Sequence, residues 1–185
     1  MERGTETNKR KQLGARSRTA ILDAALQLMS ESGYEGASVA KIAKLSGLPA
    51  SSIYWHFGSK AGILAAVMER GAEAFFSTAD EEAEPGAASN MESPGELLRM
   101  RFQQARRSAE EHPEFLRLLF LLILANPGDE AVVSILKRAN GRGRALLHAQ
   151  IAEAFSARGE EESIAIADRF TVTALMVFNG AFLTV

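Results

Sequence analysis

The chain contains no cysteine among its 185 residues, which excludes disulfide frameworks and cysteine-based metal sites. Long hydrophobic runs are also missing. The most apolar stretch, LLFLLILA at 118–125, is far shorter than the roughly 20 residues that a membrane-spanning helix needs. We therefore expect this stretch to be a helix buried in the protein, and we expect no contact with a membrane.

A catalytic constellation is missing as well. The three histidines, His56, His112 and His148, stand far apart in the sequence, and no nucleophile can be paired with a base. The stretch GRGR at 141–144 follows no predicted strand and lacks the Lys-Ser/Thr ending of a phosphate-binding loop. We therefore expect no enzymatic activity, no cofactor and no metal ion.

Strand patterns are absent too, because no stretch longer than four residues alternates polar and apolar side chains. The chain is therefore predicted to be all-α. Gly33 is expected to end a first helix, and Ser38 to cap a short second helix that Gly47 ends. Pro49 suits the first turn of a third helix, and Ser59 can cap a fourth that runs toward residue 79. Further helices are predicted at 94–111, 113–125, 129–157 and 161–185.

The net charge of −2 conceals an uneven distribution. Residues 1–60 carry nine Lys and Arg against five Asp and Glu, a net charge of +4. Residues 61–185 carry twelve against eighteen, a net charge of −6. A basic head on an acidic body suggests that the head alone binds a polyanion, although a charge of this size can also arise by chance.

The third predicted helix has an aromatic side chain on its outer face. On a helix with about 100° per residue, Ile53 and Phe57 lie about 40° apart and define a buried face. Ser51 and Trp55 then lie roughly opposite that face. Since a helix of two turns on a small domain buries one stripe, we predict that Trp55 points outward.

Two short helices joined by LSGLP at 45–49 form a helix-turn-helix pattern, whose second helix enters the major groove of DNA. Small side chains at Ala50 and Ser51 allow a close approach to base edges, and Lys60 can contact phosphate. Each polar residue taken alone is more often solvated surface, but together on one face they favour DNA. The candidate DNA-binding residues are Ser38, Ala50, Ser51, Ser52, Tyr54, Trp55, His56 and Lys60.

Residues 16–64 resemble the DNA-binding domain of the TetR family of bacterial transcriptional regulators. The stretch ILDAALQLMSESGYEGASVAKIAKLSGLPASSIYWHFGSKAGIL carries the resemblance. It includes the pairs Gly33-Tyr34 and Ile42-Ala43, together with Gly47, Tyr54, Phe57 and Lys60. The sequence departs from the family pattern at Pro49-Ala50, where a polar residue and Lys are common, and at Gly62, where an acidic helix former is usual.

The resemblance implies a homodimer that binds a palindromic double-stranded DNA operator in the bacterial cytoplasm, near the nucleoid. It also implies an all-helical ligand-binding and dimerisation domain that controls DNA binding, most often repression. We expect a basic, flexible arm at 1–15, a helix-turn-helix DNA-binding domain at 16–60 and the helical ligand domain at 61–185. Eight helices are expected here, whereas many members of the family have nine or more.

The second domain is rich in phenylalanine, which suggests a small apolar or aromatic effector, since ligand pockets are mostly apolar with a few polar groups. The candidate ligand-binding residues are Phe102, Arg106, Phe120, Asn140, Phe178 and Asn179. The alternative is that this domain binds a protein partner instead of a small molecule. A large exposed apolar patch outside the dimer would favour the alternative.

Overall fold

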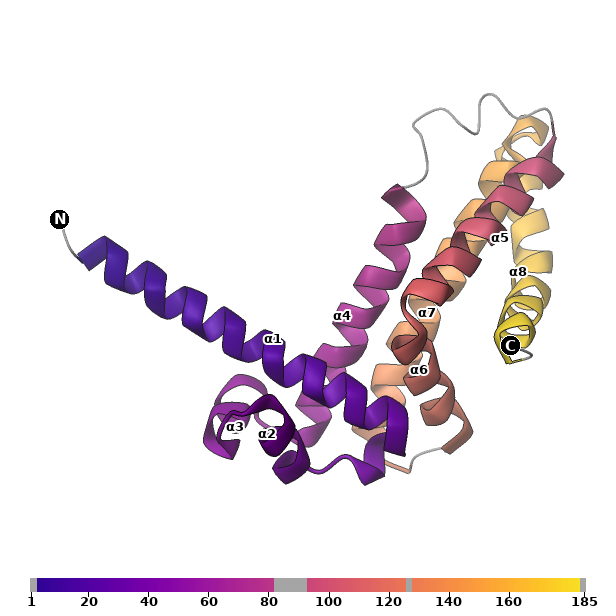
Figure 1. Ribbon diagram of the computed structural model, residues 1–185. Helices are drawn as coiled ribbons and strands as arrows, with labels where there is room; N and C mark the ends of the chain where they lie inside the picture. Colours follow the sequence, from indigo (N-terminus) through magenta and orange to yellow (C-terminus); the bar gives the residue numbers. More distant parts are fainter. Residues whose placement is uncertain (1–2, 82–92, 126–127, 184–185) are drawn as a thin grey trace. The chain divides into compact units, whose positions relative to one another are not determined.

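The computed structural model describes residues 3–81, 93–125 and 128–183, and its regular elements in these ranges are all helices (Figure 1). The prediction of an all-α fold is therefore confirmed. None of the described helices is both long enough and apolar enough to span a membrane. The helices are Arg3–Gly36 (α1), Val39–Ser46 (α2), Ala50–Phe57 (α3), Lys60–Glu81 (α4), Pro94–Glu111 (α5), Pro113–Ala125 (α6), Glu130–Ala154 (α7), the 3-10 helix Ser156–Arg158 (η2) and Glu160–Leu183 (α8).

Capping residues set several helix ends as predicted. The Ser38 hydroxyl accepts a hydrogen bond from the backbone N–H of Lys41 at 3.2 Å, and Gly47 ends α2 in the left-handed conformation (φ 70°, ψ 15°). The Ser59 hydroxyl accepts a bond from the N–H of Gly62 at 3.0 Å and so caps α4. Each of these caps satisfies a backbone group that the helix itself leaves free.

The ends of α1 differ from the prediction. The chain is helical from Arg3 onward, so the stretch expected as an arm is the first part of α1. This stretch contains no proline, the residue that most strongly interrupts a helix. At the other end, Gly33 leaves the helical conformation (φ 72°, ψ 171°), but the chain turns once more and α1 ends at Gly36. Gly33 therefore kinks the helix where the sequence predicted its end.

The first of two compact units comprises residues 1–71 and 114–136. It contains the predicted helix-turn-helix head, and also α6 and the start of α7, which were expected in the ligand domain. Burial of each large aliphatic side chain contributes about 1.5–3 kcal/mol. The side chains that form its core are almost fully buried: Ile21, Leu22, Met29, Ile42, Ile53, Ile63, Leu64, Val67, Met68, Leu118, Leu122 and Val132.

The second compact unit comprises residues 72–113 and 137–185, so it receives the end of α4, all of α5, most of α7 and all of α8. Its buried apolar residues include Phe75, Leu97 and Ile151. Polar side chains are buried in it as well, namely Gln104, Ser108, Ser163 and Thr171. This interior is therefore more polar than that of the first unit, where Ser30 is the buried polar side chain among the described residues.

Candidate nucleic-acid interface

The turn between α2 and α3 is fixed by two residues with special backbone conformations. Gly47 adopts a positive φ of 70° that other residues rarely adopt, and Pro49 holds φ at −66° with an extended ψ of 149°. Pro49 is thus the residue before α3, one position earlier than the first turn that the sequence predicted. Its carbonyl accepts the first bond of the helix from the N–H of Ser52 at 3.0 Å. The turn therefore sets where α3 begins.

The outer face of α3 carries large aromatic side chains. Ile53 is only 1 % exposed, whereas Trp55 is 79 % and Tyr54 53 % exposed. Ala50 and Ser51 are exposed at the start of the helix. The prediction that Trp55 points away from the buried face is confirmed, and α3 presents a small-residue first turn followed by an aromatic second turn.

The candidate residues next to Trp55 are less exposed. Ser52 and His56 are half-buried. The rings of Trp55 and His56 meet edge to face with centroids 4.6 Å apart. On the inner side, the Arg18 guanidinium of α1 lies 5.5 Å from the centroid of the Phe57 ring. Arg18 was not among the candidate residues, because the sequence offers no signal for a contact across 39 positions.

Lys60 lies against α1 and the turn that follows its kink. Its Nζ is 4.2 Å from the centroid of the Tyr34 ring and 3.7 Å from the Glu35 carboxylate. Burial, with the negative charges of Asp129 and Glu35, raises the pKa of Tyr34, so its ring stays neutral beneath the ammonium. Since the Lys60 side chain is 24 % exposed, part of it remains accessible at the start of α4.

Helix α2 adds further polar and basic side chains to the helix-turn-helix domain. Ser38, a candidate DNA-binding residue, is exposed, and its hydroxyl is the cap of α2. The Lys41 ammonium donates to the carbonyl of Gly36 at 2.8 Å, while Lys44 is exposed in the last turn. Lys41 and Lys44 carry positive charge and were not among the candidate residues, although their position in a short helix before the turn could have suggested them.

Gly62 has a steric role that the sequence did not reveal. A Cβ atom at this position would overlap the carbonyl oxygen of Phe57, the last residue of α3. The missing side chain therefore allows the first turn of α4 to pack directly on the end of α3.

The six candidate ligand residues do not form one group. The rings of Phe102 and Phe178 lie together, with centroids 6.2 Å apart, and Asn179 is half-buried next to Phe178 in α8. The Arg106 guanidinium bonds Glu110 at 3.2 Å on an exposed face of α5, and Asn140 is exposed. Phe120 belongs to the first compact unit, whereas the other five belong to the second.

A buried polar side chain in α5 was not predicted from the sequence. Gln104 is buried in the second unit, one helical turn before the buried Ser108. The sequence did contain a signal for it. Leu97, Gln104 and Ser108 share one helix face, and polar residues are unusual on a helix face that is buried.

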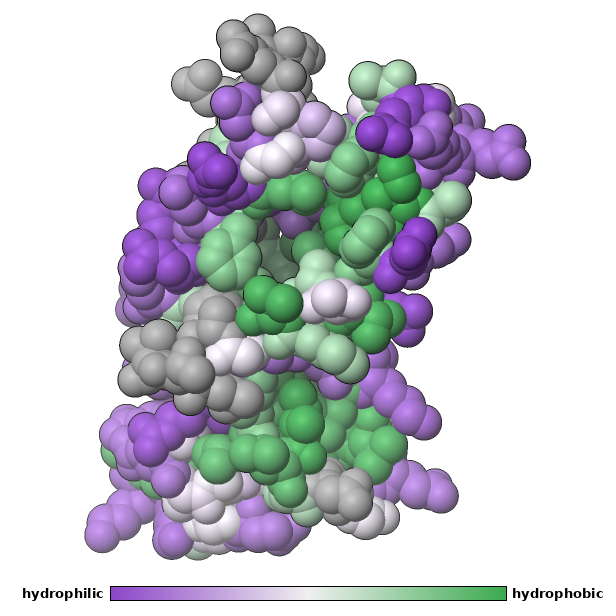
Figure 2. Space-filling model, turned by 90° about the vertical axis from the view of Figure 1, so that its right-hand side faces the viewer, coloured by the Kyte–Doolittle hydropathy of each residue, from purple (hydrophilic) through white to green (hydrophobic). Residues whose placement is uncertain are grey.

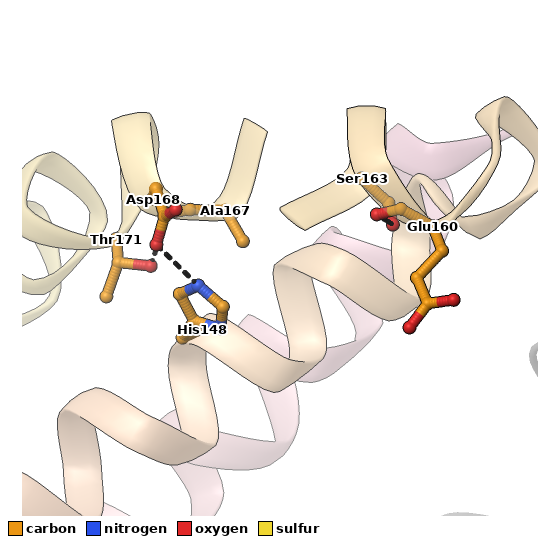
Figure 3. A network of polar contacts seen from close by, with 6 residues as sticks. All are labelled: His148, Glu160, Ser163, Ala167, Asp168 and Thr171. Atoms are coloured by element: carbon orange, nitrogen blue, oxygen red, sulfur yellow. Dashed lines mark hydrogen bonds and ion pairs between the residues drawn. The ribbon is translucent and has the colours of Figure 1, made fainter. Parts of the chain in front are cut away.

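A polar contact joins α7 to α8 (Figure 3). The Nε2 atom of His148 lies 3.0 Å from an oxygen of the Asp168 carboxylate. Close to it in α8, the hydroxyls of Ser163 and Thr171 bond to backbone oxygens of Glu160 and Ala167 in their own helix. These hydroxyls are thus satisfied without a partner from another helix.

Comparison with known proteins agrees with this geometry. Residues 21–67, which run from the core of α1 through α3 into α4, match the family described as bacterial regulatory proteins, tetR family. A curated relative, the HTH-type transcriptional regulator AcrR of Shigella flexneri, is 39 % identical over 61 residues. The match covers 33 % of this chain and 28 % of the relative, so this chain spans under a third of the relative's length in the match.

Solved structures share the fold over most of the chain. The TetR family regulator PfmR of Thermus thermophilus is 24 % identical, with a TM-score of 0.62 over 88 % of this chain and 84 % of that one. A transcriptional regulator of Saccharomonospora viridis, solved in complex with choline, is 18 % identical, with a TM-score of 0.67 over 92 % and 85 % of the two chains. The likeness in fold therefore extends beyond the 21–67 region that the family model matches.

Proposed function

Because the chain belongs to the TetR family of bacterial transcriptional regulators, we propose that it is a repressor that leaves its DNA operator when a small molecule binds. The observation that carries the proposal is the outward face of α3, where Trp55 is exposed opposite the buried Ile53 and Tyr54 is exposed at its side. Exposed aromatic side chains gathered on one short helix are typical of a surface that binds a partner. Such a role belongs in the bacterial cytoplasm, on the chromosome.

On DNA, α3 lies in the major groove. Its first turn, with Ala50 and Ser51, approaches the base edges, and Trp55 contacts a thymine methyl group or donates its N–H to a base. Tyr54, Ser52 and His56 flank this face and donate to the phosphates of the two strands. Lys60 and Ser38 stand at the starts of α4 and α2, where positive ends of helix dipoles also favour phosphate.

A dimer is needed for two copies of α3 to reach successive major grooves, which lie about 34–36 Å apart. The surface proposed for the second copy is the outward face of α8. It carries Phe170, Val172, Met176 and Val177, which are all exposed, and lies on the side of the helix away from the buried Thr171. Figure 2 shows that hydrophobic side chains gather on the side of the molecule that it views.

Control by a ligand requires that the ligand bind one arrangement of the dimer better than another. We assign the transmission to α4, because this helix runs without interruption from residue 60 in the first unit to residue 81 in the second. The ligand is a small apolar or aromatic molecule held in the second unit, near Phe102 and Phe178. The complex of the Saccharomonospora viridis regulator with choline supports the capacity of this fold to hold a small molecule.

Selection from a random-sequence duplex library with the purified protein tests the proposal. We expect enrichment of a palindrome whose half-sites are centred about one helical turn apart. Fluorescence anisotropy should then give an affinity at least about 1,000-fold above that for random duplex at the same salt concentration. Enrichment of no sequence, or equal affinity for selected and random duplexes, would refute the proposed repressor function.

A further inference from the structure

The inner face of α5 is polar where a buried helix face is normally apolar. Arg101, Gln104 and Ser108 follow one another on this face at a spacing of three or four residues. Gln104 is 2 % exposed and Ser108 is fully buried. The Arg101 side chain is 14 % exposed. These three residues are called the α5 polar stripe.

Two atoms of the α5 polar stripe lack a partner among the described residues. The Ser108 hydroxyl donates to the carbonyl of Phe75 at 2.5 Å, and the Arg101 Nη2 donates to Glu153 at 3.1 Å. In contrast, Gln104 Oε1 and Arg101 Nε are buried and find no hydrogen-bond partner in the part of the chain that the structure describes. Unpaired buried polar atoms destabilise a fold unless something else bonds them, so their presence on one turn of α5 points to a ligand.

Phe102, the residue after Arg101 in α5, belongs to a cluster of aromatic rings. Phe75, whose carbonyl bonds Ser108, has its ring 6.5 Å from that of Phe178, and the Phe178 ring lies 6.2 Å from that of Phe102. Both pairs meet edge to face. A further aromatic ring can join a cluster of this kind in the same geometry, which is the one that aromatic pairs prefer.

We infer that the α5 polar stripe and these rings bind an uncharged aromatic molecule that carries a hydroxyl group. The inference rests on the proposed function and names the chemistry of its effector. A hydroxyl group offers an acceptor for the N–H of Arg101 Nε and a donor for Gln104 Oε1, so its chemistry matches both unpaired atoms. A carboxylate ligand is disfavoured, because Glu153 already balances the charge of the Arg101 guanidinium.

Calorimetry on the full chain with three probes tests the inference: naphthol, methoxynaphthalene, which cannot donate a hydrogen bond, and naphthoate, which is charged. We expect naphthol to bind roughly ten-fold more tightly than either of the others, the effect of one or two buried hydrogen bonds. Gln104→Met, which keeps the volume and removes the polar atoms, should abolish the preference for naphthol over methoxynaphthalene. The neighbouring Gln103 is exposed, so Gln103→Met is the matched control and should keep the preference.

Stability adds a second readout. Because Gln104→Met removes an unpaired atom, the melting temperature of the unliganded protein should stay the same or rise. A lower melting temperature would mean that Gln104 is bonded within the protein, and it would overturn the inference. Equal binding of naphthol and methoxynaphthalene, binding of neither, or an unchanged preference in Gln104→Met would overturn it as well.

Operator binding separates this inference from the proposed function. If the protein binds its operator but no probe, the inference fails and the assignment as a DNA-binding regulator stands. If naphthol binds with the expected preference but does not release the operator, the inference stands and ligand control of DNA binding fails.

Discussion

The indole of Trp55 is 79 % exposed, so the folded head gains almost nothing from it. Against DNA the same ring offers apolar surface to a thymine methyl group and one N–H donor. We predict that Trp55→Ala weakens binding to the selected operator by about 1–3 kcal/mol and affects random duplex much less. Anisotropy titrations on both duplexes measure the difference.

The matched control for Trp55 lies two residues earlier. Ile53 is 1 % exposed, and truncating a buried Ile to Ala costs about 2–5 kcal/mol of stability. Ile53→Ala should therefore lower the melting temperature, whereas Trp55→Ala should not. If Trp55→Ala lowers the melting temperature as much as Ile53→Ala does, or weakens binding to operator and random duplex equally, Trp55 does not contact bases.

Lys60 is held by Tyr34 and Glu35 in the unbound protein. If its ammonium also meets phosphate, Lys60→Met should weaken operator and random duplex about equally. The slope of log K against log salt should fall by about 0.9 for each phosphate that the variant no longer neutralises. The exposed Lys137 of the second unit serves as the control, and Lys137→Met should leave the slope unchanged. If the slope is unchanged in Lys60→Met, Lys60 does not contact phosphate and its role is limited to the contact with Tyr34.

At the scale of the helices, the junction of α3 and α4 depends on Gly62. A methyl group there would overlap the Phe57 carbonyl, and overpacking of this kind costs about 1–3 kcal/mol. Gly62→Ala should therefore lower the melting temperature, although alanine is the better helix former. Gly14 lies within α1 with no described atom near its missing side chain, so Gly14→Ala should raise stability by up to about 1 kcal/mol. Equal effects of the two substitutions would show that the junction tolerates a side chain.

The start of α1 carries basic residues ahead of its first core residue, Ile21. Deletion of residues 1–14 removes Arg3, Lys9, Arg10 and Lys11. If they reach the DNA backbone, the salt slope should fall by up to about 0.9 for each phosphate that they neutralise. The melting temperature should change little, since the core is kept. If the slope equals that of the full chain, residues 1–14 do not contact the DNA backbone.

Local signals were enough to predict α2 and the cap of α4, although not the two ends of α1. Ser38, Gly47 and Ser59 stand where the caps are found, because a cap depends on neighbours within a few residues. The outward position of Trp55 followed from the angle between positions on a short helix. Contacts between distant segments could not be predicted in this way: the overlap that Gly62 avoids and the unpaired atom of Gln104 arise only when separate helices pack.

At the scale of the whole molecule, the outward face of α8 is the surface proposed to hold the two subunits together. Met176 is 69 % and Val177 63 % exposed, and an apolar surface of this kind gains free energy when a second copy covers it. We predict that Met176→Glu yields monomers in size-exclusion chromatography with light scattering. Placing a carboxylate in an apolar interface without a partner costs several kcal/mol, which is enough to separate the subunits.

Such a monomer should keep its folded head, so the circular dichroism spectrum should stay helical while binding to the full palindrome falls to that of a single half-site. The control is Leu124→Glu, at an equally exposed apolar residue in α6 of the first unit. If α8 is the dimer surface, Leu124→Glu stays dimeric and binds the palindrome normally. If Met176→Glu stays dimeric, or if Leu124→Glu becomes monomeric, the dimer interface is not on α8. The spacing of the two α3 helices would then depend on another surface.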